Sequence, residues 1–227
     1  MKKKSILFLL FAMPFIGLSQ NSSVVPIDAL YREDQIYFGT TYNMLIDTPE
    51  GYTQTDFSPG FKAGFIRDFP INKLRDIAFG LGFGYALNTS AQNLKITPTV
   101  NGSFEYEFLS GQNYQKNRFL YQAIEIPFEF RWRTSTAQSN KFWRIYVGFK
   151  TSYVFSSRTF FKANNETIIY KGLEFNSWQY GLTLSTGYNN WNAFIYYGLN
   201  PIFETVSVNQ NPLEMKSLKV GLMFYIL

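Results

Sequence analysis

The chain has 227 residues, with 21 Lys and Arg against 16 Asp and Glu, and it contains neither cysteine nor histidine. The lack of cysteine excludes disulfides, and the lack of histidine removes the commonest general base and metal ligand, so Ser-His-Asp, Cys-His and zinc-site chemistries are excluded. Aromatic residues make up 19 %, including 24 Phe and 16 Tyr, so we expect a single aromatic-rich domain without metal or cofactor.

The N-terminus has the pattern of a secretory leader. Three lysines precede an apolar run over residues 6–18, and Gly17 and Ser19 then occupy the small-x-small spacing of a cleavage site. The pattern predicts a cleaved signal peptide over residues 1–19, the alternative being an uncleaved anchor. Its removal leaves 18 Lys and Arg against 16 Asp and Glu, a balance that gives no argument for nucleic acid as a partner.

Beyond the leader, apolar residues alternate with small or polar ones, and this period of two predicts β-strands. The run from Ile77 to Asn88 is the plainest case, because its bulky residues alternate with Ala and Gly throughout. We expect eight strands, at 35–46, 60–69, 77–88, 119–132 and 142–156, in the two arms of a hairpin over 176–200, and at 216–227.

The hairpin is centred on Asn189-Asn190, since Asn tolerates the positive φ that a two-residue turn requires. Folding about this turn predicts four facing pairs on one apolar face. They are Tyr188 with Trp191, Leu184 with Ile195, Leu182 with Tyr197, and Tyr180 with Leu199.

Long and short connections alternate between the predicted strands, which is typical of an outer-membrane barrel with its short turns and both termini in the periplasm. We therefore predict an all-β fold, an eight-stranded antiparallel up-and-down transmembrane β-barrel over residues 35–227, preceded by a periplasmic segment over 20–34. Outer-membrane lipid is the expected partner of its apolar face. Three tryptophans beside the short turns, Trp132, Trp143 and Trp191, would form a periplasmic aromatic belt.

The opposite face of the strands carries the charges and would line the lumen. A secreted barrel with an apolar interior is the alternative, but it would place these charges outside. A lumen charge network is therefore expected, made of Glu125, Glu129, Arg131, Arg144 and Lys150. The plausible pairs are Glu125 with Lys150 and Glu129 with Arg144. The network is either a polar pathway through the lumen or a set of salt bridges that fills it.

Two local features add to this pattern. Pro127 removes a ladder donor inside its strand and predicts a bulge or a bend there. Asn101-Gly102 predicts a hairpin in the longest loop that would extend the neighbouring strands outward. One face of that hairpin, with Phe104, Tyr106 and Phe108, is either a partner-binding edge or a packed lid.

The strands resemble the small outer-membrane β-barrel family called PorT-like or porin-like. The matching stretches are Gly60–Phe65, the glycine ladder over Ala78–Gly84, the segment Ile124–Phe128 and the segment Tyr196–Leu199. The resemblance implies an eight-stranded integral outer-membrane protein, and some members of the family serve a protein-secretion system.

Two classes of function remain. The first is a structural or accessory barrel of the bacterial outer membrane, with envelope or secretion proteins as candidate partners. The second is a barrel that binds or transports a small ligand through its lumen charges or its loops. An enzyme is not expected, because the sequence offers no nucleophile-base pair, and because a narrow barrel of eight strands leaves no cleft to reach the carboxylates Glu125 and Glu129.

Overall fold

The computed structural model describes residues 32–109, 111, 114–134, 142–164, 166–208 and 211–226. The predicted signal peptide and nearly all of the segment 20–34 lie outside these residues, so both stay predictions. The described part of the chain contains no helix of the length and apolarity needed to cross a membrane.

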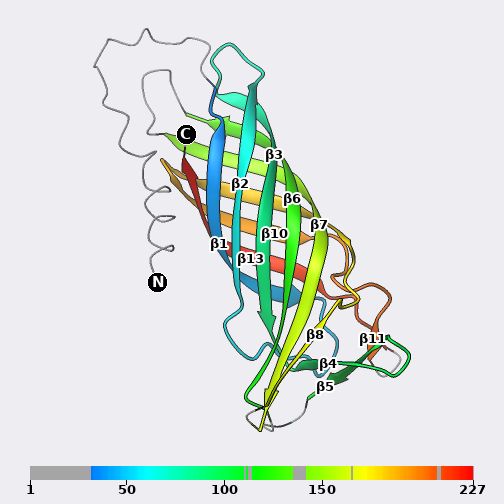
Figure 1. The fold of residues 1–227 in the computed structure, drawn as a ribbon. Helices are drawn as coiled ribbons and strands as arrows, with labels where there is room; N and C mark the ends of the chain where they lie inside the picture. The colour runs from blue at the N-terminus through cyan, green and yellow to red at the C-terminus, as the bar shows by residue number, and fades with distance from the viewer. Residues whose placement is uncertain are drawn as a thin grey trace, which may run out of the picture.

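Eight antiparallel strands form a closed barrel (Figure 1), as the alternation predicts. Its neighbours follow the order β6-β3-β2-β1-β13-β10-β9-β7, and pairing of β6 with β7 closes the ring. The strands are β1 (Gln35–Ile46), β2 (Pro59–Pro70), β3 (Ile77–Ala91), β6 (Lys116–Arg133), β7 (Trp143–Ala163), β9 (Trp178–Tyr188), β10 (Trp191–Gly198) and β13 (Lys216–Ile226).

Five shorter strands lie in the long connections. β4 (Leu94–Pro98) pairs with β5 (Phe104–Phe108), β11 (Ser207–Val208) pairs with β12 (Asn211–Pro212), and β8 (Glu166–Lys171) pairs with the outer part of β7. Figure 1 shows β7 and β8 projecting beyond the barrel at the end away from the C-terminus. We call the end of the barrel that carries the long connections the loop end. The opposite end, with the short connections, is the turn end.

The hairpin between β9 and β10 has the predicted turn and register. Trp191 faces Tyr188, Ile195 faces Leu184 and Tyr197 faces Leu182. Asn189 has a φ of 56°, the left-handed conformation for which an Asn was expected. The local pattern therefore predicts the turn and these three pairs correctly, and the ladder ends at Gly198, before the predicted pair of Tyr180 with Leu199.

The outer surface of the barrel is apolar and aromatic along every strand. Phe83, Val147 and Leu182 are each at least half exposed, and the alternate residues of the same strands are buried. Trp132, Trp143 and Trp191 are all exposed near the turn end, where Trp191 lies 4.9 Å from Phe224 between ring centroids. Such a continuous apolar belt is matched by lipid and not by water.

Small residues on β3 make room for large side chains inside the barrel. A Cβ at Gly80 would collide with the guanidinium of Arg131, and one at Gly84 would collide with the hydroxyl of Tyr37. The glycine ladder therefore lets charged and aromatic side chains of other strands cross the lumen.

Of the bulge or bend predicted at Pro127, the bulge does not form there. Pro127 faces Lys150 in regular register, and only the ladder toward β3 is interrupted beside it, because proline has no N–H to donate there. The bulge lies instead where Gln122 and Ala123 of β6 face Ser156 and Val154, which leaves Phe155 without a partner on β6. It reverses the faces of β7 beyond this point, so that Val154 and then Ser157 point inward.

Candidate functional site

The five predicted lumen charges all lie in the barrel interior. Glu125, Glu129, Arg131, Arg144 and Lys150 are buried, each with no more than 6 % of its surface exposed. Lys62, Asp68 and Lys219 lie inside with them, as the face alternation indicates, together with Glu33 and Arg133. Apart from Arg144, these side chains form two groups at different heights.

The turn-end network consists of Glu33, Asp68, Glu129, Arg131 and Arg133. Asp68 is its centre, because its carboxylate accepts hydrogen bonds from Arg131 at 3.1 Å and from Arg133 at 2.9 and 2.8 Å. Glu129 pairs with Arg131 at 3.0 Å, and Glu33 pairs with Arg133 at 3.4 Å. Buried charges are tolerated only when paired in this way, so the network closes this end of the lumen with fixed side chains.

The predicted pair of Glu129 with Arg144 does not form. The register places Gly148 opposite Glu129 and places Arg144 opposite Arg133, so Glu129 bonds instead to Arg131, two residues along its own strand. The guanidinium of Arg144 makes no hydrogen bond to any described residue and stacks on aromatic rings, with its carbon 4.4 Å from the ring centroid of Phe142.

The central lysine cluster consists of Lys62, Lys150, Lys219 and Glu125. Glu125 forms the predicted ion pair with Lys150, and Lys219 donates a hydrogen bond of 2.8 Å to Asn88. Aromatic rings face the ammonium groups as well, since the Nζ of Lys62 lies 3.2 Å from the ring centroid of Phe194. Three cations thus share one carboxylate.

A cavity of about 10 Å³ lies between the two groups, lined by Lys62, Glu125 and Glu129 among others. This volume accommodates about one water molecule. The lumen at this height is therefore filled by side chains, as expected of an eight-stranded barrel.

An apolar cap closes the loop end. Its 15 buried residues come from the barrel strands and from three of the long connections: Leu94, Ile96, Tyr106, Phe119, Tyr121, Ala123, Val154, Leu173, Phe175, Ile202, Phe203, Val206, Val208, Leu213 and Met215. Phe203 lies near its middle, with ring centroids 5.0 Å from Phe175, 5.6 Å from Tyr106 and 5.8 Å from Phe119.

The predicted hairpin about Asn101-Gly102 exists, but it does not extend β3 and β6. β4 and β5 form a separate two-stranded sheet, and Asn117 holds the bend before it by donating 2.9 Å hydrogen bonds to the carbonyls of Gln92 and Leu94. Tyr106 is buried in the cap, and Phe104 and Phe108 pack partly buried against it. This aromatic face therefore covers the barrel, and partner binding by the hairpin stays a prediction.

We expect Phe203→Ala to destabilise the folded loop end, because a buried aromatic side chain leaves a cavity when it is truncated. The expected cost is about 3–5 kcal/mol. Hydrogen exchange of β4, β5 and the segment around Phe175 would measure it, with the exposed Phe57 of another loop as the control site for Phe57→Ala. Unchanged protection in Phe203→Ala would show that the cap does not hold the loops in place.

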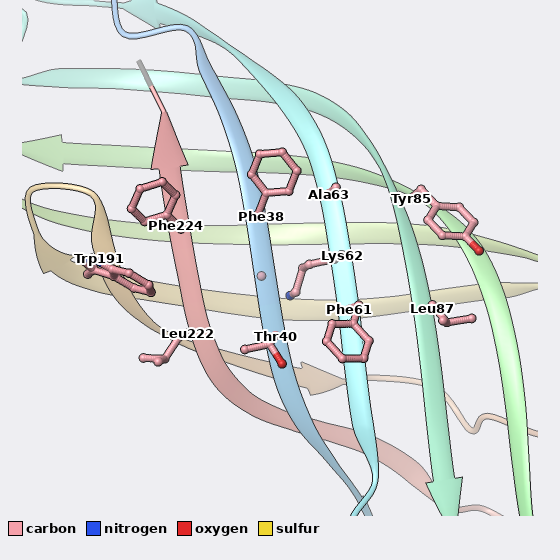
Figure 2. Close-up of a pocket in the computed structure, with 11 residues that line it drawn as sticks. Phe38, Thr40, Phe61, Lys62, Ala63, Tyr85, Leu87, Trp191, Leu222 and Phe224 are labelled. Carbon is pink, nitrogen blue, oxygen red and sulfur yellow. The ribbon is translucent and has the colours of Figure 1, made fainter. Parts of the chain in front are cut away.

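A hollow of about 520 Å³ on the outer wall is lined by residues of β13, β1, β2 and β3 and by Trp191 of β10 (Figure 2). The small side chains of Thr40 and Ala63 lie between larger ones such as Phe61 and Phe224 (Figure 2). Apart from Gly39 and Lys62, which lie on the lumen face of their strands, these positions belong to the lipid-facing wall, so acyl chains are its natural contact.

Sequence reasoning missed Glu33 and Arg133 as members of the turn-end network. Both lie just outside the predicted strand limits, at Gln35 and Trp132. A signal was present, because continuing the period of two places Glu33 in line with Gln35, and Arg133 in line with Arg131. Among the described residues, no group of three or more acidic side chains is arranged to hold a metal ion.

Comparison with known proteins gives one family match. The model of the family described as outer membrane protein beta-barrel domain matches residues 18–204. None of the curated proteins compared with the chain matches it.

Among solved structures, the chain is similar to Ail, the attachment invasion locus protein of Yersinia pestis, with 11 % identity, 87 % of this chain and 100 % of that chain covered, and a TM-score of 0.43. The same protein in complex with the heparin analogue sucrose octasulfate gives 10 % identity, the same coverage and a TM-score of 0.41.

Proposed function

The chain belongs to the outer membrane protein beta-barrel domain family and is an integral protein of the bacterial outer membrane, and we propose that it acts as a structural or accessory barrel through its extracellular loops. The observation that carries this proposal is the closed lumen. The turn-end network and the central lysine cluster fill its periplasmic and middle parts, and the apolar cap fills its extracellular part. A solute would have to displace both ion pairs and packed aromatic rings to pass.

The finer role that fits this architecture is that of a subunit in a protein-secretion or surface-assembly system, as in some PorT-like proteins that the strands resemble. The long connections support it, because they carry their own small strands and three of them pack together in the apolar cap. Function in barrels commonly resides in such loops, held in place by the barrel scaffold.

A small-ligand transport barrel is the second candidate, and the central lysine cluster is the observation that favours it. Lys62, Lys150 and Lys219 have one carboxylate among them, which would suit an anion. The cavity beside them holds about one water molecule, so this function would require the cap and the network to open.

We expect the purified protein to show no steady conductance in planar lipid bilayers, because no continuous aqueous path crosses the barrel. The measurement compares wild type with Phe203→Ala, which loosens the cap but leaves the turn-end network intact. A stable ion-selective conductance in the wild type would contradict the closed-lumen proposal and favour the transport candidate.

Extraction of tagged protein from outer membranes in mild detergent tests the accessory role. We expect a large envelope protein to co-purify in near-stoichiometric amount, and we expect Glu105→Lys with Glu107→Lys, both exposed on β5, to reduce its recovery. The matched control reverses two other exposed loop-end acids, Glu50→Lys with Glu204→Lys. A folded monomer without a partner would contradict the stable-subunit role.

A further inference from the structure

The protruding part of β6, β7 and β8 carries five cations on its outward face. This basic rim consists of Lys116 and Arg118 on β6, Arg158 and Lys162 on β7, and Lys171 on β8. The register arranges them as rows across the three strands: Lys116 beside Lys162, Arg118 beside Phe160, and Leu120 beside Arg158 and then Lys171.

Like charges are directly opposed within this rim. Lys116 faces Lys162 across β6 and β7, and Arg158 faces Lys171 across β7 and β8. Such pairs destabilise a sheet. The bulge at Phe155 creates this arrangement, because the face reversal of β7 beyond it turns Arg158 and Lys162 outward, toward the cations of β6.

The protein itself neutralises little of this charge. Within the described residues, Arg118 with Asp56 at 3.5 Å is the one ion pair that any of the five makes, and that carboxylate is largely exposed. The Nε atoms of Arg118 and Arg158 are buried without a hydrogen-bond partner among those residues. Lys116, Arg118 and Lys162 also line a groove of about 370 Å³, with Leu120 and Phe160 between them. The rim therefore combines a hollow, unmatched donors and uncompensated charge.

The rim begins just above the lipid-facing belt. Tyr85 and Phe155 belong to the belt beside the rim, with their ring centroids 6.3 Å apart, and the hydroxyl of Tyr85 donates a hydrogen bond of 2.9 Å to Gln122. Leu120 is one row further out, and Arg118 is about 13 Å along the strand from Gln122. Aromatic belts mark the membrane interface, so the cations are at the height of the lipid headgroups.

We propose that the basic rim binds the phosphate groups of an anionic lipid headgroup in the outer leaflet. The grid supplies charge-assisted donors from three strands, and its interleaved Leu120, Phe160 and Ile169 suit a ligand whose other end is a hydrocarbon chain. The rim continues the outward face of β6 and β7, which carries the lipid-facing belt further along the same strands, and this favours a lipid over a soluble polyanion. Neutralisation by phosphate offsets the repulsion between the opposed cations.

The test compares the full-length protein with two triple variants of equal charge change. The rim variant removes three cations of the basic rim, by Lys116→Gln, Arg158→Gln and Lys162→Gln. The control variant removes three cations elsewhere, by Arg67→Gln, Lys73→Gln and Lys216→Gln. The protein is placed in micelles of a neutral detergent that contain equal amounts of phosphatidylglycerol and phosphatidylcholine. Native mass spectrometry then measures which lipid stays bound. We expect the rim variant to lose at least about tenfold in phosphatidylglycerol retention and the control to keep it.

Stability provides a second readout, because the loss of the rim cations should have different effects on stability without and with anionic lipid. In neutral micelles the rim variant should be as stable as wild type or more stable, because the opposed cations are gone. Added phosphatidylglycerol should raise the unfolding midpoint of wild type and of the control, and not that of the rim variant. Equal lipid retention by the rim variant and wild type would overturn the proposal. If inorganic pyrophosphate stabilises the wild type as much as phosphatidylglycerol does, the bound phosphate need not belong to a lipid. That result would overturn the lipid proposal and assign the rim to a soluble polyanion.

Discussion

Asp68→Ala is expected to destabilise the barrel by about 3–5 kcal/mol, because it removes the partner of two buried cations at once. Asp68 is completely buried and binds Arg131 and Arg133 through three hydrogen bonds. Neither guanidinium reaches solvent, so neither can exchange the lost carboxylate for water. The two arginines would be left with Glu129 and Glu33 as their remaining carboxylate partners.

Urea unfolding of the refolded barrel in micelles measures this loss. Asp68→Asn keeps the shape of the side chain and removes the charge, so it should recover only part of the stability. Asp47→Asn is the matched control, since it breaks the exposed pair with Lys216, keeps a residue that tolerates the positive φ of 54° at this position, and should cost less than about 1 kcal/mol. Equal unfolding midpoints for Asp68→Ala and Asp47→Asn would mean that water enters the turn-end network and solvates the arginines.

Glu125→Gln is expected to cost a comparable amount, about 3–5 kcal/mol, because it leaves three buried lysines without a carboxylate. Lys150 loses its ion pair, and Lys62 and Lys219 lose the one opposite charge of the central lysine cluster. The formal charge of the cluster rises from +2 to +3.

Lys150→Met in the Glu125→Gln background returns the cluster to +2, and we expect it to restore most of the lost stability. A double-mutant cycle of unfolding free energies isolates this coupling. Glutamine has nearly the same volume as glutamate, so a difference in unfolding free energy between wild type and Glu125→Gln does not come from lost packing. If the single and the double variant are equally destabilised, the role of Glu125 is not the neutralisation of these lysines.

Particular residues show how far the sequence leads toward this fold and its interior. The alternation of Ile77 to Asn88, and the hairpin about Asn189, predict strand positions and faces because these depend only on local backbone geometry. Which charges pair depends on how β6 and β7 align, and the face alternation does not determine that. Glu125 faces Ser152, and the long side chain of Lys150, two residues away, still reaches it. Glu129 faces Gly148, and Arg144 is four residues away, so the second predicted pair does not form.

The sequence by itself determined eight strands, their lipid-facing and inward faces, and the enclosure of the charged residues, because side chains alternate with period two and apolar surface must meet lipid. Only the tertiary structure decided which charges meet, that Phe155 is bulged, and that the loops pack into an apolar cap with Phe203 near its middle. Those features depend on contacts between residues far apart in the chain. Asp68 and Arg133, for example, are 65 residues apart and meet only when the barrel closes.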